Sequence, residues 1–293
     1  MYERILIPLD GSELAERALS YAGAIAKRLK SEVVLLNVCT PGGGMERPLR
    51  AYLEKQAEEL VSMGAKASAV VVEGDAAEEI LSLAEANYVG LIVVSTHGLS
   101  GSSRWAMGNV ASKVLQKSHT PTLLVKPGGS EPALDENGLG SILVSLDGSR
   151  FAEAIIPYVE VLVRGMDSEA ALVTVIEPVK LPRMESYGHW VDFDKYEKGL
   201  ADEAEARARR YLSEQELALR EKGVTVNSTV LSGRPAETIL QYAEDRCVGV
   251  IAMSTHGYSG ITRWAYGSVA SKVVECSSRP VLLVRPDAPP TDD

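Results

Sequence analysis

The sequence predicts an α/β protein of two tandem domains, each a doubly wound, parallel, five-stranded sheet flanked by helices, of the Rossmann-like or flavodoxin-like kind. Three observations support this. The chain has 293 residues, enough for two domains of ordinary size. A long segment of the first half returns almost unchanged in the second. Within each half, short apolar runs alternate with amphipathic stretches, the pattern of strands joined by helices.

In the first half, the apolar runs and amphipathic stretches define nine elements. We expect strands at 3–9, 32–39, 66–72, 89–95 and 121–126, and helices at 13–29, 46–63, 75–86 and 103–118. Such alternation favours a parallel sheet with right-handed crossovers and helices on both faces. We expect the second half to repeat this order, with a longer helix at 194–221.

The spacing between repeated segments has two values along the chain. The segment STHGLSGSSRWAMGNVASKVL at 95–115 returns 159 residues later as STHGYSGITRWAYGSVASKVV, whereas ILIPLDGS at 5–12 returns as ILVSLDGS after only 137. The second half therefore holds 22 extra residues, which the pairing of Val38 with Val175 places within 176–222. The stretch between the halves is rich in Gly, Pro and acidic residues, as linkers are. We expect a first domain at 1–128, a linker at 129–139, a second domain at 140–288 and a tail at 289–293.

Composition narrows the classes of function. A formal net charge of −10 disfavours binding to nucleic acid or to anionic lipid. The three cysteines, Cys39, Cys247 and Cys276, have no CxxC spacing, which argues against a disulfide framework or a zinc site. The chain contains no run of eighteen apolar residues, which is about the length that a membrane-spanning helix requires. We expect a cytoplasmic protein that does not contact membranes.

Two turns in each half have the character of a ligand site. In an open parallel sheet the ligand crevice lies beyond the carboxyl ends of the strands, where the strand order reverses. The turn Leu9-Asp10-Gly11-Ser12 follows the first predicted strand and recurs as Leu146-Asp147-Gly148-Ser149. A glycine-rich turn follows the fourth strand and leads into a helix. The N–H groups at such a helix start form an anion site suited to phosphates.

The glycine-rich turn carries a family resemblance. Gly98 is followed by nine residues and Gly108-Asn109, and Gly257 by nine residues and Gly267-Ser268. This spacing, with the opening ILIPLDGS and the closing TPTLLVKP and RPVLLVRP, resembles universal stress proteins of the ATP-binding type over nearly the whole chain. The resemblance implies a fold like that of adenine nucleotide alpha hydrolases.

The resemblance further implies one adenine nucleotide per domain, ATP with or without Mg²⁺. Asp10 and Asp147 would lie near the adenine or ribose, and the backbones of Val38 and Val175 at the adenine edge. The residues expected to surround the two nucleotides are Pro8, Leu9, Asp10, Gly11, Ser12, Val38, Ser95, His97, Gly98, Gly101, Arg104, Gly108, Asn109 and Val110 in the first half, and Leu146, Asp147, Gly148, Ser149, Val175, Ser254, His256, Gly257, Gly260, Arg263, Gly267, Ser268 and Val269 in the second.

Each half departs from the family motif. Ser95 and Ser254 stand where the motif begins with glycine, so a positive φ would cost more there, although the hydroxyl could contact ribose or phosphate. Asn109 replaces the motif's final serine or threonine, and Ser145 stands where the first half has Pro8. After the third strand the first half has GDAAEEI and the second GRPAETI. We expect the second half to bind nucleotide at least as well.

Several residues allow simpler interpretations. Asp10 and Asp147 could cap the first helix of each half, alone or besides contacting a ligand. No triad-like spacing accompanies His97 or His256, which favours structural or ligand-orienting roles.

Two further features stay open. Arg104 and Arg263, one turn into the predicted phosphate helices, could reach a polyphosphate or pair with surface carboxylates. The aromatic residues of the insertion could form a lid or a partner surface, or extend a helix packed on its own domain.

Our leading hypothesis is an ATP-binding stress-response or regulatory protein in which nucleotide occupancy is the signal. The chain has no P-loop and no clear catalytic base, so we assign no catalytic residue. One alternative is a slow ATP hydrolase or nucleotidyl-transfer enzyme. The other is a nucleotide-free scaffold for a protein partner that the sequence does not identify.

The last strands of the two halves suggest how they assemble. TPTLLVK at 120–126 and RPVLLVR at 279–285 are short and apolar, and exposed strand edges tend to pair. Because a linker holds them at high effective concentration, we expect them to pair within one chain as a pseudo-dimer. A homodimer would then use other surfaces, with the helix at 194–221 as the candidate.

Overall fold

The computed structural model describes residues 1–96, 107–126, 139–181, 192–257 and 267–286. The predicted linker, apart from Leu139, and the predicted tail lie outside these residues. In the first half the elements are β1 (Arg4–Pro8), α1 (Glu13–Leu29), β2 (Glu32–Cys39), α2 (Glu46–Ser62), β3 (Lys66–Glu73), α3 (Ala76–Ala86), β4 (Leu91–Ser95), α4 (Asn109–Lys117) and β5 (Thr122–Val125). In the second half they are β6 (Ser141–Ser145), α5 (Arg150–Glu153), α6 (Ile156–Met166), β7 (Glu169–Ile176), α7 (Phe193–Glu221), β8 (Val226–Ser232), α8 (Pro235–Asp245), β9 (Val250–Ser254), α9 (Ser268–Cys276) and β10 (Val281–Val284).

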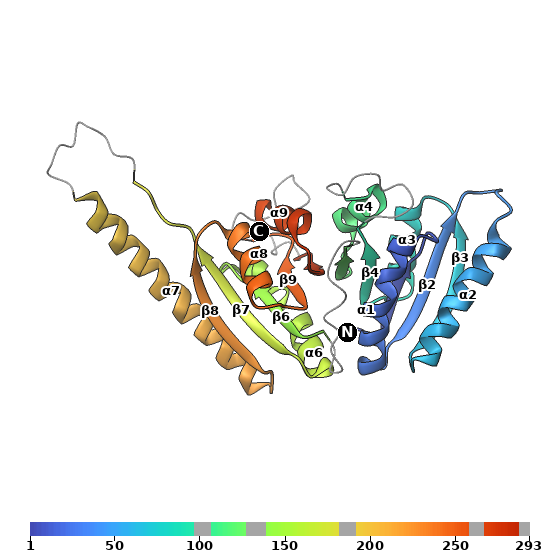
Figure 1. Cartoon of the computed structure of the whole chain (residues 1–293), viewed down its shortest axis with the longest axis horizontal. Helices are drawn as coiled ribbons and strands as arrows, with labels where there is room; N and C mark the ends of the chain where they lie inside the picture. Colours follow the sequence, from blue (N-terminus) through green and yellow to red (C-terminus); the bar gives the residue numbers. More distant parts are fainter. Residues whose placement is uncertain (97–106, 127–138, 182–191, 258–266, 287–293) are drawn as a thin grey trace, which may run out of the picture.

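The strands form one sheet in the order β3-β2-β1-β4-β5-β10-β9-β6-β7-β8 (Figure 1). Within each half all neighbouring strands are parallel, and the order reverses beside the first strand of that half. The predicted doubly wound α/β fold is therefore confirmed. The two half-sheets join where β5 and β10 pair antiparallel, with Leu124 opposite Val281 and Thr122 opposite Leu283. The last strands of the two halves thus pair within the chain, as we expected.

Helices cover both faces of this sheet, and each helix layer is shared by the two halves. Successive strand residues point to opposite faces. Ile5 and Ile7 belong to a core beneath α1, α2, α6 and α7, whereas Leu6 belongs to a second core beneath α3, α4, α8 and α9. Strands buried on both faces need continuous apolar sequence, which explains runs such as that of β4.

Two helices differ from the prediction. The helix expected at 103–118 begins only at Asn109, because Gly108 is extended (φ −60°, ψ 150°) and donates its N–H to the Thr96 carbonyl at 2.7 Å. In the second half, the counterpart of α1 is divided into α5 and α6. Pro157 near the start of α6 has no N–H with which to continue the α5 hydrogen bonds.

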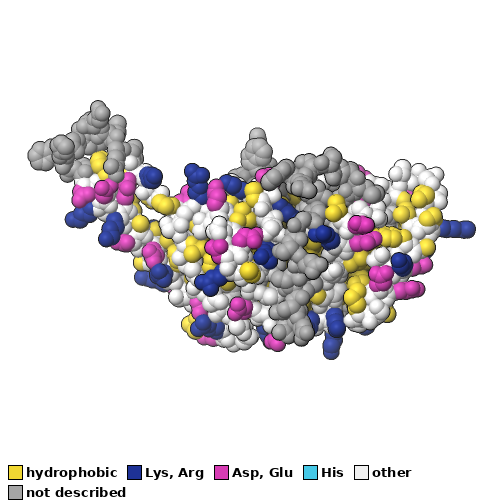
Figure 2. All heavy atoms as spheres, viewed as in Figure 1, with side chains coloured by type: hydrophobic (Ala, Val, Ile, Leu, Met, Phe, Trp, Pro, Cys, Tyr) yellow, Lys and Arg dark blue, Asp and Glu magenta, His cyan; other side chains and the backbone are white. Residues whose placement is uncertain are grey.

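Helix α7 lies within the stretch that holds the insertion and begins one residue before the predicted position. Its fully buried residues, Leu212 and Leu219, lie in its second half, and Figure 1 shows its first half running beyond β8. Acidic and basic side chains are interspersed along it (Figure 2). Tyr196 is exposed, whereas Tyr187, His189 and Trp190 of the insertion lie outside the described residues.

In the described part of the chain, no helix combines the length and the apolar character that crossing a membrane requires.

Candidate functional site

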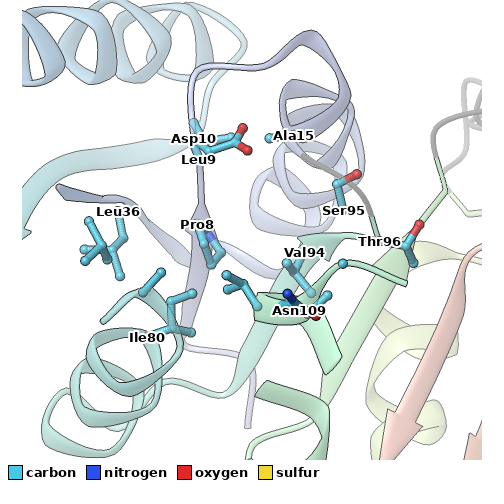
Figure 3. A pocket seen from close by; sticks show the side chains of 15 residues that line it. Pro8, Leu9, Asp10, Ala15, Leu36, Ile80, Val94, Ser95, Thr96 and Asn109 are labelled. Carbon is cyan, nitrogen blue, oxygen red and sulfur yellow. The ribbon is translucent and has the colours of Figure 1, made fainter. Parts of the chain in front are cut away.

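Each half has one pocket at the carboxyl ends of its strands, beside the point where the strand order reverses. The first, of about 150 Å³, is lined by Pro8, Leu9, Asp10, Ala15, Leu36, Val38, Ala76, Ile80, Val94, Ser95, Thr96, Gly108, Asn109, Val110 and Ala111 (Figure 3). The second, of about 450 Å³, is lined by Ser145, Leu146, Asp147, Ala152, Val175, Glu177, Pro235, Ile239, Met253, Ser254, Thr255, His256, Gly257, Gly267, Ser268, Val269 and Ala270. The pockets thus occupy equivalent places in the two half-sheets.

The Asp-Gly-Ser turn has the same geometry in both halves. Gly11 has φ +85°, a conformation that glycine adopts without strain. The Ser12 hydroxyl caps α1 by accepting the Ala15 N–H at 3.1 Å. The Asp10 carboxylate in turn accepts the N–H and the hydroxyl of Ser12 at 3.0 and 2.6 Å. Serine is therefore the helix cap, and the aspartate holds that serine while lining the pocket.

The turn of the second half repeats each of these contacts. Ser149 accepts the Ala152 N–H at 3.1 Å, and Asp147 holds Ser149 at 3.0 and 2.6 Å. Of the predicted site residues, Gly11, Ser12, Gly148 and Ser149 shape these turns and are not among the residues that line the pockets. Turn residues were included in the prediction because sequence alone does not show which of them face the crevice.

The helices α4 and α9 begin at the pockets. Gly108 and Gly267 are their N-caps, and neither helix has a side-chain cap. Each glycine donates its N–H to the carbonyl of Thr96 or Thr255, at 2.7 and 2.8 Å. No side chain of the described residues accepts the N–H groups of the first helical turn, and the helix dipole there favours a negatively charged ligand.

The floor of each pocket is apolar and comes from strands and helices together. In Figure 3, Leu36 from β2, Ile80 from α3 and Val94 from β4 surround one cavity, with Asp10 and Asn109 at its edge. The predicted residues Val38 and Val175 also line their pockets. A flat apolar ring such as a purine suits these surroundings.

The second pocket shows one close backbone approach. The Asp147 carboxylate lies directly against the Cα of Gly257, where any Cβ would clash with it. His256 is buried, and its Nδ1 lies 3.0 Å from the Thr255 hydroxyl. The predicted site residues His97, Gly98, Gly101 and Arg104, with Gly260 and Arg263 of the second half, lie outside the described residues.

The strand ends and helix starts on either side of the phosphate turn bear on two sequence expectations. Ser95 and Ser254 end strands β4 and β9, and neither has a positive φ, so the absence of the motif's glycine causes no backbone strain there. The Ser254 hydroxyl donates to the Val284 carbonyl at 3.3 Å. Arg104 and Arg263 precede α4 and α9 in the chain instead of lying one turn into them, because Gly108 and Gly267 set the helix starts.

Sequence reasoning missed part of the pocket walls. Ala76 and Ile80 of α3, and Pro235 and Ile239 of α8, line the two pockets. The repeated segments GDAAEEI and GRPAETI were the available signal, since both start a helix directly after a strand end.

A tyrosine beside each Asp-Gly-Ser turn was also missed. The Tyr52 hydroxyl donates to Glu16 at 2.8 Å. Burial, and then Glu16, raise the pKa of Tyr52 well above its usual range. In the second half Tyr211 lies beside Glu153, and burial and then that carboxylate raise its pKa, but its hydroxyl has no hydrogen-bond partner among the described residues.

The described residues contain no group of three or more His, Cys, Asp or Glu side chains that could hold a metal ion. Among the described lining residues, the first pocket has the carboxylate of Asp10, and the second has those of Asp147 and Glu177 with the imidazole of His256.

The duplicated α/β domain, with a strand-end pocket beside a helix N-terminus in each half, defines the structural class, and the comparisons identify the family. The family model described as the universal stress protein family matches residues 1–126 and 139–285. The chain belongs to the universal stress protein family.

Relatives with the same tandem organisation are known. A universal stress protein of Mycolicibacterium smegmatis is 22% identical over 96% of this chain and 97% of its own length. The crystal structure of a universal stress protein from Archaeoglobus fulgidus shares the fold, with a TM-score of 0.73, 22% identity and coverage of 97% of this chain and 99% of that one. A universal stress protein crystallised in complex with cAMP is similar to a single half, with 27% identity, a TM-score of 0.38 and coverage of 43% of this chain and 98% of that one.

Proposed function

We propose that each half binds one ATP in its strand-end pocket and that nucleotide occupancy serves as a regulatory signal in the stress response. One observation carries this proposal. In both halves an apolar cavity adjoins a helix start whose N–H groups lack a side-chain cap. An apolar cavity suits adenine, and free N–H groups at a helix start suit phosphate.

The residues divide this task. The apolar floor and the strand-end backbone at Val38 would hold the adenine, and Asp10 lies where a ribose hydroxyl could donate to it. The N–H groups at Asn109 and Val110 would bind phosphate oxygens. In the second half Val175, Asp147 and Ser268 take the same roles. We propose that any Mg²⁺ is carried by the nucleotide phosphates, since the described residues offer no cluster of metal ligands.

The phosphate helices also reach the contact between the halves, which gives occupancy a route to the rest of the molecule. Arg285 follows β10 and donates to the Gln116 carbonyl at the end of α4, at 2.8 Å. Lys126 follows β5 and donates to the Glu275 carbonyl near the end of α9, at 2.5 Å. Each half therefore holds the C-terminal end of the other half's phosphate helix.

Calorimetry of the full chain with ATP and Mg²⁺ tests the proposal. We expect two ATP per chain, and a stabilisation of about 2.7 kcal/mol for each site at a free concentration of 100 times Kd. Mass spectrometry of the ligand released from the denatured protein should detect adenine nucleotide. The absence of both binding heat and thermal shift at millimolar ATP would favour the nucleotide-free scaffold. Multiple-turnover consumption of ATP would favour the hydrolase.

A further inference from the structure

We propose that the two pockets select different ligands: the second takes nucleoside triphosphate, and the first prefers an adenine ligand of lower negative charge, such as adenosine or a nucleoside monophosphate. This inference rests on the proposed nucleotide binding and ranks the ligands of each pocket: the first pocket still binds ATP, but less tightly than the second does. It comes from residues around the pockets that the duplication did not keep.

Size is the first difference. The second pocket has about 450 Å³ and the first about 150 Å³. Pockets for ligands of drug size commonly measure about 300–1,000 Å³. The second pocket falls in that range, whereas part of a nucleoside triphosphate bound in the first would extend beyond the pocket's walls.

The start of the helix after the third strand of each half is the second difference. In the first half Asp75 directly precedes the lining residue Ala76 and accepts the N–H groups of Ala77 and Glu78 at 3.0 and 3.2 Å. Its other oxygen lies 3.3 Å from Lys113 of α4. A fixed carboxylate therefore already satisfies these donors and the nearest cation, and it repels a polyphosphate.

In the second half the equivalent position is Arg234, directly before the lining residue Pro235. It provides no side-chain cap for α8, and its side chain is 85% exposed. The counterpart of Lys113 is Lys272, and Lys272 and Arg234 both contact Glu237, at 2.5 and 3.9 Å. Glu237 corresponds to Glu78, so this carboxylate is present in both halves. The entrance of the second pocket thus has two cations where the first has one cation and one extra carboxylate.

Other charges around the entrances follow the same trend. Directly after the Asp-Gly-Ser turns, exposed Glu13 corresponds to exposed Arg150. At the ends of the third strands Glu73 corresponds to Ser232, and in the helices that follow Glu79 corresponds to Thr238. One pair opposes the trend, since Thr40 corresponds to Glu177, which lines the second pocket. The second entrance is therefore the more positive of the two, in spite of Glu177.

This difference should separate ligands by charge. ATP carries several negative charges, AMP fewer and adenosine none, so only the charged ligands respond to the entrance. Interactions between exposed charges are modest and screened by salt. We therefore expect the second pocket to bind ATP about tenfold or more tightly than the first at low salt, and the two to differ by less than about threefold for adenosine.

Charge-reversal variants of the full chain test the inference. Gly108→Val and Gly267→Val each leave one pocket open, and circular dichroism and thermal unfolding check their folding. Arg234→Asp is then added to Gly108→Val, and Asp75→Arg to Gly267→Val. The matched controls, Arg246→Asp and Glu85→Arg, make the same charge changes near the far ends of α8 and α3. Calorimetry measures Kd for ATP, AMP and adenosine at two salt concentrations.

We expect Arg234→Asp to weaken ATP binding about tenfold and Asp75→Arg to strengthen it by a similar factor. The Kd for adenosine should not change in either variant, and the control substitutions should change no Kd. If a Gly→Val variant unfolds, the charge reversal is instead made in the chain that keeps both glycines. The two binding steps of its calorimetric isotherm, one for each pocket, then give the same comparison. Equal ATP-to-adenosine preference in both pockets, or equal effects of the reversals and their controls, would overturn the inference alone. Absence of binding by any adenine ligand would overturn the proposed function as well.

Discussion

A charged substitution at the contact between β5 and β10 should destabilise the whole chain. Leu124 is 1% exposed and Leu283 is 2% exposed, and both belong to the core beneath α3, α4, α8 and α9. Their strands supply the antiparallel pairing that joins the two half-sheets. We consider Leu124→Asp and Leu283→Asp, which remove buried apolar volume and introduce a carboxylate without a cation beside it.

The expected magnitude follows from burial. Truncation of a buried leucine costs about 2–5 kcal/mol through lost contacts and the remaining cavity. A buried carboxylate adds several kcal/mol, or takes up a proton to avoid that cost. The loss should therefore exceed about 4 kcal/mol, against a stability of about 5–15 kcal/mol for a typical protein. Either variant should unfold at much lower urea concentration or fail to accumulate as folded protein.

Urea unfolding followed by circular dichroism measures the effect, and light scattering measures mass. Leu217→Asp is the matched control, because Leu217 is 60% exposed on α7 and the same change should stay within about 0.5 kcal/mol. If Leu124→Asp kept the wild-type urea midpoint and altered only the mass in solution, the β5–β10 pairing would be a contact between molecules, and our reasoning would be refuted.

Three further predictions address the pockets and their surroundings. Gly267→Val should weaken ATP binding in the second half more than tenfold in calorimetry, because the side chain would occupy the phosphate position, whereas Trp264→Phe should have little effect; equal affinities would move the site elsewhere. Burial raises the pKa of Tyr52 above its usual value of 10.0, so its contribution to stability is complete below pH 10 and is lost as pH rises above it. The free energy of unfolding should therefore fall less between pH 9 and 12 in Tyr52→Phe than in the wild type. The control Tyr88→Phe, at an 89% exposed position, should lose as much as the wild type. Equal losses in Tyr52→Phe and the wild type would show that burial of Tyr52 does not cause the pH dependence. Lys126→Ala and Arg285→Ala should each lower stability by about 1 kcal/mol in urea unfolding, since each removes a hydrogen bond to the other half's helix; no change would show these contacts to be incidental.

Much of the fold was predictable because the relevant forces are local in the chain. The strand predicted at 32–39 has the predicted bounds in the structure, since a strand buried on both faces needs apolar sequence. The strand predicted at 66–72 extends one residue further, to Glu73, at the partly exposed edge of the sheet. The helix at 13–29 was predicted to the residue, because Ser12 supplies a cap and Lys30 ends the helix in the left-handed conformation.

The start of α4 was not predictable in the same way. Its position depends on the hydrogen bond from Gly108 to Thr96, which joins two segments separated by the whole glycine-rich turn. The composition of 103–108 alone does not exclude helix. The same limit explains the missed pocket walls: Ala76 and Ile80 became site residues only because α3 packs beside α4 at the end of the sheet.

The duplication separates residues that build a pocket from residues that choose its ligand. Asp10, Ser12 and Gly108 recur in the second half with nearly the same geometry, because the turn and the helix start fail without them. Exposed entrance positions are under a weaker constraint, since surface charges contribute little to stability. Asp75 also caps α3 through the N–H groups of Ala77 and Glu78, a modest contribution to stability, whereas the equivalent Arg234 provides no side-chain cap for α8. A tandem chain can therefore acquire two ligand preferences from one ancestral pocket by changes of small cost to folding, and the difference between Asp75 and Arg234 is a change of that kind.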